Sequence, residues 1–281
     1  MSLITINCYN CGSSEYSLYD IENGYKYVKC KNCNLIYLNP RPVNEDISAS
    51  HKIGEHRGNK LINVTGKYKK QKITKYVNTL KDFYKKDELE NKNWLDIGCG
   101  FGEFMEALIL YTNSEIKIKG SEPNKYKIQS CKSRELDVSF IDLDNWDEKY
   151  DFISLLNVYS HLPDPIEFLK KIKRFLNPNG ELFIETGHSS HLPVKYHQKP
   201  YYAPDHLSFA NKEIVENILQ RLGFEIIKTE VYRVENFPRI TDIKGNLKQL
   251  ARIFLRRGGS WSNLLAKYPN RDMFIRARLK R

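Results

Sequence analysis

A glycine-rich turn between an apolar segment and an amphipathic helix is the feature that most limits how this 281-residue chain can fold. The turn reads Asp-Ile-Gly-Cys-Gly-Phe-Gly over residues 96–102. Glycines let the backbone approach a ligand and leave the first N–H groups of the following helix free to bind it. The spacing is GxGxG rather than the GxGxxG of dinucleotide sites, and Glu122 ends the next apolar strand, where a carboxylate can hold both ribose hydroxyls. The pattern therefore favours an adenosine ligand other than a nicotinamide dinucleotide.

Apolar strands and amphipathic helices alternate from residue 93 onward. Strands are expected at Trp94–Ile97, Ile116–Ser121, Val138–Ile141, Tyr150–Leu156, Glu181–Thr186, Phe224–Thr229 and Asp272–Leu279. Helices are expected after the glycine turn, from Asn124, over Pro165–Leu176 with a stop at Asn177–Gly180, and over Asn211–Leu222. This alternation predicts an α/β fold with a doubly wound, mostly parallel sheet. An insertion at about 231–271 interrupts it, and we expect its basic helical stretch, 243–257, to pack on its own domain.

Four cysteines near the N-terminus are arranged as two CxxC pairs separated by 18 residues: Cys8, Cys11, Cys30 and Cys33. Two such turns can complete a tetrahedral four-sulfur zinc site, which leaves no open position and is therefore structural. A redox dithiol and incidental cysteines are the alternatives. The tyrosines and aliphatic residues between the pairs are typical of the hairpins of a zinc ribbon.

The chain divides by composition into three parts. We expect a zinc-ribbon module over residues 1–42, which ends at the proline-rich Asn39–Pro42. Residues 43–90 are expected to hold a linker or loop over 43–60 and then a helix within 60–85. The main α/β domain is expected over 91–281.

The motifs LDIGCGFG and GSEPN, with the later run YDFISLLNVYSHLPDPIEFLKKIKRFLNPNGELFIET, resemble class I methyltransferases over roughly residues 93–230. The resemblance implies a Rossmann-like sheet with an antiparallel last strand, and S-adenosylmethionine as cofactor. It also implies that the glycine turn lies against the methionine end, that Glu122 binds ribose and that Asn157 lies beneath the sulfonium. The implied cofactor-binding residues are Asp96, Gly98, Cys99, Gly100, Phe101, Gly102, Glu122, Pro123, Asp142, Leu143, Asn157 and Val158.

A four-cysteine module before such a domain is similar to bacterial deoxysugar C-methyltransferases and their short relatives in surface-polysaccharide gene clusters. Asn157–Asp164 is similar to their NVxxHxPD signature, and Tyr201–Phe209 to their YxEHxSYF segment. The resemblance implies His206 as the base that takes the acceptor proton, Asp205 as the group that orients it, and His161 as a catalytic or loop-holding residue. Independently, five of the seven histidines fall after the expected fourth and fifth strands, at the edge where open α/β sheets bind ligands.

These features predict a cytoplasmic S-adenosylmethionine-dependent methyltransferase with a small polar acceptor, namely a sugar nucleotide, a lipid-linked sugar or another polysaccharide precursor. An RNA methyltransferase is the alternative, favoured by the zinc module and a net charge of +11, and a non-catalytic zinc-ribbon binding protein is a third. Nucleic acid is the less favoured partner because the 45 basic residues, against 34 acidic ones, are not gathered into one run. No uncharged apolar run approaches the ~20 residues that a membrane span requires.

Overall fold

The computed structural model of the chain describes residues 2–197, 199–232, 247, 250–251, 253–255 and 272–280. Most of the insertion at 231–271, and with it most of the basic stretch 243–257, lies outside the described residues. Within the described ranges, no helix combines the length and the apolar character needed to cross a membrane.

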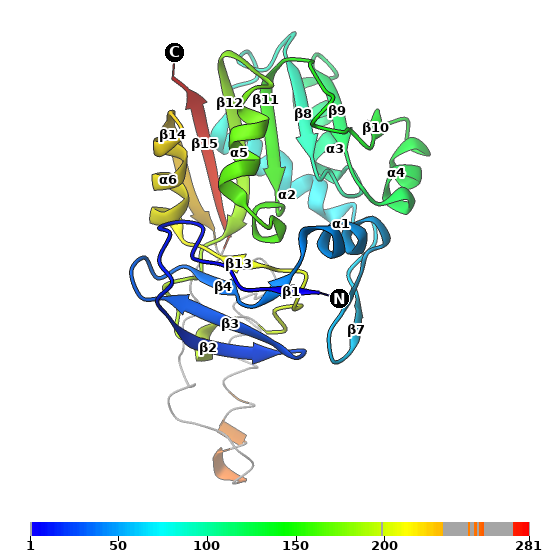
Figure 1. Ribbon diagram of the computed structural model, residues 1–281. Helices are drawn as coiled ribbons and strands as arrows, with labels where there is room; N and C mark the ends of the chain where they lie inside the picture. The colour runs from blue at the N-terminus through cyan, green and yellow to red at the C-terminus, as the bar shows by residue number, and fades with distance from the viewer. Residues whose placement is uncertain are drawn as a thin grey trace.

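In the described part of the chain, a seven-stranded sheet has the strand order β10-β9-β8-β11-β12-β15-β14 (Figure 1). These strands are, in the same order, Val138–Ser139, Lys117–Ser121, Asn93–Ile97, Tyr150–Leu156, Leu176–Gly187, Asp272–Leu279 and Phe224–Tyr232. The strands from β10 to β12 run parallel, whereas β15 pairs antiparallel with both β12 and β14. The predicted Rossmann-like sheet with an antiparallel last strand is therefore confirmed.

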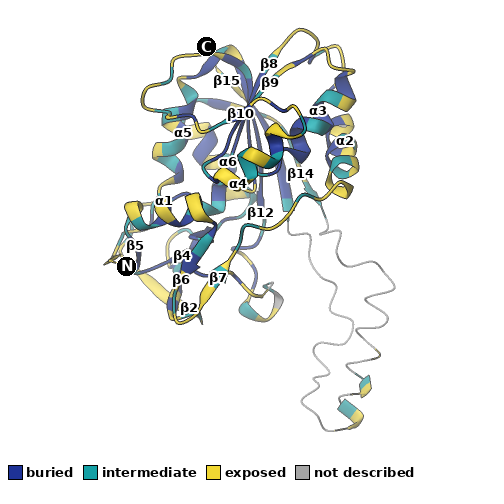
Figure 2. Ribbon diagram, turned by 90° about the vertical axis from the view of Figure 1, so that its right-hand side faces the viewer, coloured by how far each residue is buried: buried dark blue, intermediate teal, exposed yellow. Residues whose placement is uncertain are grey.

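Helices cover both faces of this sheet. On one face, α2 (Gln71–Phe83) and α3 (Glu103–Thr112) pack largely through aromatic rings, and Trp94 of β8 stacks on Phe152 of β11 with 4.7 Å between ring centroids. On the other face, α5 (Pro165–Lys173) and α6 (Lys212–Arg221) pack mainly through aliphatic side chains. A further helix, α4 (Lys125–Lys132), lies beside the β10 edge. The sheet is consequently buried between helices whose outer faces are exposed (Figure 2).

Two expected elements differ in the structure. The segment 43–60, expected as a linker or loop, contains α1 (Asn44–Ile53) and the strand β6 (Glu55–Arg57), which pairs with β7 (Leu61–Asn63). Only two residues of α1 are buried, so the helix leaves little apolar periodicity in the sequence. The stop expected at 177–180 instead lies inside β12, because Tyr150 pairs with Leu176 while Phe152 pairs with Glu181, and the extra residues form a bulge.

The N-terminal strands form a second sheet that the main domain completes. Its order is β13-β4-β3-β2, in which β2 (Tyr16–Glu22), β3 (Tyr25–Cys30) and β4 (Ile36–Leu38) are joined by β13 (Ser208–Phe209) from the loop that follows β12. The remaining short elements are β1 (Leu3–Ile4), β5 (Arg41–Pro42), η1 (Tyr159–His161) and η2 (Val194–Tyr196). Figure 1 shows this sheet beneath the carboxyl ends of the parallel strands, so the loop after β12 lies between the two sheets.

Candidate active site

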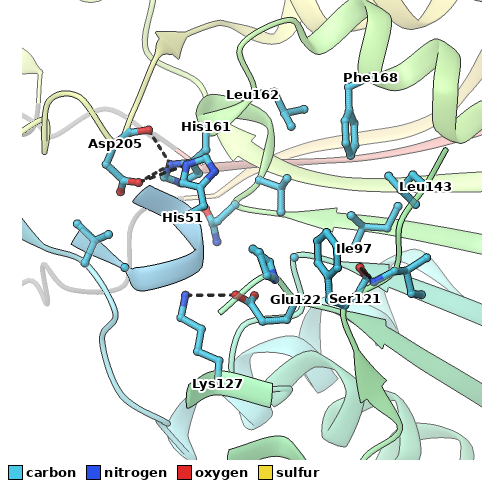
Figure 3. Close-up of a pocket in the computed structure, with 18 residues that line it drawn as sticks. His51, Ile97, Ser121, Glu122, Lys127, Leu143, His161, Leu162, Phe168 and Asp205 are labelled. Atoms are coloured by element: carbon cyan, nitrogen blue, oxygen red, sulfur yellow. Dashed lines mark hydrogen bonds and ion pairs between the residues drawn. The ribbon is translucent and has the colours of Figure 1, made fainter. Parts of the chain in front are cut away.

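A cleft at the carboxyl end of the parallel strands is made of two adjoining hollows. The first has a volume of about 350 Å³ and is lined by residues at the ends of β8, β9 and β11 together with His51, His161 and Asp205 (Figure 3). The second, of about 250 Å³, is lined by the glycine turn and by the segment 64–72. Gly98 and Asn157 line both hollows, so the two adjoin at these residues.

Glu122 lies at the junction between β9 and α4 and supports the glycine turn. Its carboxylate accepts hydrogen bonds from the backbone N–H groups of Gly100 and Asn124, both at 3.0 Å. The side chain is buried, and burial raises the pKa of Glu122 although Lys127 Nζ lies 4.0 Å from it. A buried carboxylate in this position can accept hydrogen bonds from ribose hydroxyls in place of some of the backbone hydrogen bonds that it accepts here.

The glycine turn leaves room for a ligand at one particular residue. Gly100 has φ +58°, and a Cβ added there would meet no atom within 4 Å. At Gly98, with φ +69°, an added Cβ would instead lie 2.4 Å from the Val158 side chain. The turn therefore has one open position facing the cleft and one tightly packed position that holds its shape.

Two further buried acids stand near the cleft. Asp96 accepts a 2.6 Å hydrogen bond from Ser154, and burial raises the pKa of Asp96 to about 7. Glu185 is held by Lys75 at 3.1 Å, by the Tyr76 hydroxyl and by the Asn157 side-chain amide. Burial also raises the pKa of Glu185. Buried acidic groups favour a cationic ligand, because a positive charge nearby stabilises their ionised form.

Most of the sequence-predicted cofactor residues line this cleft, and two do not. Those that line it are Asp96, Gly98, Cys99, Gly100, Phe101, Glu122, Pro123, Leu143, Asn157 and Val158. Gly102 instead caps α3, and a Cβ there would lie 2.5 Å from Leu136. Asp142 is exposed and accepts hydrogen bonds from Asp144 and Asn145.

The carboxylate of Asp205 lies at the centre of a histidine cluster at the cleft. Its Oδ1 lies 3.0 Å from His56 Nε2, 3.2 Å from His161 Nδ1 and 3.9 Å from His51 Nε2. Burial opposes ionisation, but the neighbouring imidazoles outweigh it and hold the pKa of Asp205 well below its usual range. Burial alone would lower the pKa of His161, but the neighbouring Asp205 carboxylate raises it above its usual value.

His206, which the resemblance implies as the base, lies next to His161. Its ring stacks on that of His161 with 4.5 Å between centroids, and its Nδ1 lies 2.7 Å from the Tyr201 carbonyl oxygen. Burial, followed by the charge of His161, lowers the pKa of His206 to about 4. His161 and Asp205 line the cleft, whereas His206 does not.

The four N-terminal cysteines converge as their spacing predicts. Their sulfur atoms lie within 4.8 Å of one another, and Cys8–Cys33 and Cys11–Cys30 are each separated by 3.5 Å. The two pairs make equivalent turns, since Gly12 N–H donates to Cys8 O and Asn34 N–H donates to Cys30 O. Four sulfurs bound to one zinc at about 2.3 Å would lie about 3.8 Å apart, so the cluster has the dimensions of such a site.

Several residues of the cleft were not predicted from the sequence. His51 and its neighbour His56, which does not itself line the cleft, come from the segment expected as a linker. Lys67 and Lys69 precede α2, and Lys72 lies in its first turn. The presence of two histidines five positions apart was the only sequence signal of a site in this segment. Nothing in the sequence indicated that they would contact Asp205.

Comparison with known proteins decides the family. Residues 68–229, more than half of the chain, match the family described as "Methyltransferase domain". The chain belongs to this family. Over 73% of its length it also resembles the structure of a SAM-dependent methyltransferase from Archaeoglobus fulgidus, with a TM-score of 0.51, 22% identity and 94% of that chain covered. Coclaurine N-methyltransferase shares the fold as well, with a TM-score of 0.53, 11% identity, and 73% of this chain and 71% of the other covered.

Two curated relatives carry the name tRNA U34 carboxymethyltransferase. The protein from Nautilia profundicola is 34% identical over 109 residues, which are 35% of this chain and 35% of the relative. The protein from Campylobacter jejuni subsp. doylei is 35% identical over 120 residues, 39% of each. The match thus spans little more than a third of the relatives' own length.

These relatives contradict the expectation of a sugar or polysaccharide-precursor acceptor, and with it the expectation that nucleic acid is an unlikely partner. The charge argument was wrong because it counted basic residues along the sequence. In the folded chain Lys67, Lys69 and Lys72 line the same hollow as Lys127, although Lys127 is far from them in the sequence.

If Glu122 holds the ribose of the cofactor, Glu122→Ala should weaken the binding of S-adenosylhomocysteine by about 1–3 kcal/mol, because charge-assisted hydrogen bonds are lost. Isothermal titration calorimetry measures this change. Glu148→Ala is the matched control, since Glu148 is an exposed acid that does not line the cleft. Equal affinities in the two variants would contradict the assignment.

Proposed function

We propose that this protein is an S-adenosylmethionine-dependent transferase whose acceptor is an RNA, with transfer RNA as the substrate to test first. The observation that carries the proposal is the similarity to proteins named tRNA U34 carboxymethyltransferase, together with membership of the methyltransferase family. The similarity extends over about a third of the chain, so the proposal also relies on what surrounds the cleft.

The rim of the cleft carries positive charge that acidic side chains do not neutralise. Lys67, Lys69 and Lys72 are exposed and form no ion pair with any residue in the described ranges. The helix α4 contributes Lys127 to the same hollow and also carries the exposed Lys125 and Lys132 and the Tyr126 ring, which is 64% exposed. Lysines bind phosphates and an exposed aromatic ring can stack on a base, so this rim suits a polynucleotide.

Within the cleft, we propose that the glycine turn and Glu122 hold the cofactor and that Asp205 and His161 contact the acceptor. Both of the latter line the same hollow as Glu122. His206 is proposed as a positioning residue, because its ring stacks on His161. Methyl transfer requires the accepting atom and the sulfonium to be aligned, so the principal task of these residues is orientation.

The protein should transfer radiolabelled methyl groups from S-adenosylmethionine to unmodified tRNA. Reversing charge at two rim lysines, Lys67→Glu with Lys72→Glu, should weaken tRNA binding and reduce the slope of log affinity against log salt concentration by about 2. Filter binding at several salt concentrations measures both quantities.

Lys92→Glu with Lys117→Glu is the matched control for charge, because these two exposed lysines lie at the starts of β8 and β9, at the opposite end of the strands from the cleft. Affinity for S-adenosylhomocysteine should be measured in every variant to separate loss of RNA from loss of cofactor. Label that enters small molecules but no RNA would contradict the proposal.

For the N-terminal module, we propose that Cys8, Cys11, Cys30 and Cys33 bind one structural zinc ion. Two observations support this proposal: the four thiols converge, and the two CxxC pairs make equivalent turns. Such a site would hold β3 and β4 against β13, which belongs to the loop carrying Asp205.

Purified protein should then contain about one zinc per chain in the cysteine module, and Cys30→Ser should release it because a thiolate ligand is lost. Cys131→Ser is the control, since Cys131 is a buried cysteine outside the module. Metal analysis by mass spectrometry reads out both variants. A disulfide within either CxxC pair, with no bound zinc, would overturn the assignment.

A further inference from the structure

A second set of metal-ligating side chains lies in the described part of the chain, apart from the cysteines. His51, His161 and Asp205 each offer one ligand atom, and these atoms lie within 4.8 Å of one another. Figure 3 shows the three side chains converging at one end of the cleft, from α1, from η1 and from the loop before β13. Ligand atoms bound to one ion at about 2.1 Å are about 3.0–3.4 Å apart, so small side-chain rotations would bring all three to one ion.

One atom of this set lacks a partner. His51 Nε2 is buried and makes no hydrogen bond to any residue in the described ranges, although it lies 3.9 Å from Asp205 Oδ1. Leaving a buried polar atom without a hydrogen bond costs free energy. A metal ion between His51 and Asp205 would satisfy that nitrogen.

The surrounding contacts are those that fix metal ligands in orientation. His161 Nδ1 lies 3.0 Å from the backbone carbonyl oxygen of Asp205, and a proton on this nitrogen holds the ring in place and leaves Nε2 as the atom that can bind an ion. His56 is almost fully buried, and its Nε2 lies 3.0 Å from the carboxylate of Asp205. Ligating histidines and carboxylates are commonly held by outer contacts of this kind.

We infer that His51, His161 and Asp205 bind a divalent first-row transition metal ion whose open coordination positions face the cleft. Two imidazoles and one carboxylate suit zinc, iron(II) or manganese(II) better than magnesium or calcium, which prefer oxygen ligands. Three protein ligands leave positions for water or for an acceptor atom, unlike the closed set of four cysteines. Because Asp205 and Glu122 line the same hollow, an acceptor held by this ion would lie next to the cofactor.

Metal binding by the full chain, purified without a histidine tag, tests this inference directly and needs no knowledge of the acceptor. Titration with cobalt(II) should show two classes of site. The cysteine set should give an intense thiolate-to-cobalt charge-transfer band, whereas the histidine set should give only weak visible bands. His51→Ala should weaken binding at the second site by about 100-fold or more, since removal of an outer contact alone costs about 10- to 100-fold.

His191→Ala is the control, because His191 is an exposed histidine outside the cluster. His161→Gln provides a second test from a different element, in case His51→Ala disturbs α1. Both cluster variants should retain the thiolate band, which shows that the N-terminal module is intact. A total of one metal ion per chain at saturating cobalt, or an unchanged second site in both cluster variants, would overturn the inference.

Discussion

The ionised, buried carboxylate of Asp205 joins the two halves of the molecule. His51 and His56 come from the N-terminal part, whereas His161 follows β11 of the central sheet, and all three face one oxygen of this carboxylate. A buried charge is stable only when it is paired and hydrogen-bonded, so these contacts also fix the loop that carries Asp205. Pairing of β13 with β4, and the hydrogen bond from the Tyr27 hydroxyl to the His206 carbonyl, hold the same loop from the other side.

This arrangement explains why the N-terminal module matters for a site that lies at the end of the main sheet. The parallel strands supply the glycine turn, Glu122 and Asn157, which line the cleft and which we propose hold the cofactor. The N-terminal part lines the cleft with His51 and Gly54, on the side where we propose that the acceptor binds. The acids Asp96, Glu122 and Glu185 are kept buried in the main domain, where a cationic sulfonium would stabilise their charge.

Local signals in the sequence were sufficient for the first strands and helices of the main sheet. The strand, GxGxG turn, helix and acid-ended strand follow one another within 30 residues, and each has its own pattern of residues. The same holds for the two CxxC pairs, whose cysteines converge. Local signals failed where a contact depends on residues far apart in the sequence: α1 buries too few apolar residues to show a period, and the contact between His56 and Asp205 spans most of the chain. The acceptor was misjudged for the same reason, because lysines 67–72 and Lys127 meet only in the folded chain.

We propose that the cofactor lies with its ribose on Glu122 and its sulfur directed toward the cluster of Asp205, His51 and His161. A crystal structure of the full chain with S-adenosylhomocysteine tests this claim most directly. Both ribose hydroxyls should bind the Glu122 carboxylate, the homocysteine should lie along the glycine turn beside Gly100, and the sulfur should face the hollow that Asp205 lines. Ribose bound elsewhere, or a sulfur directed away from that hollow, would contradict it.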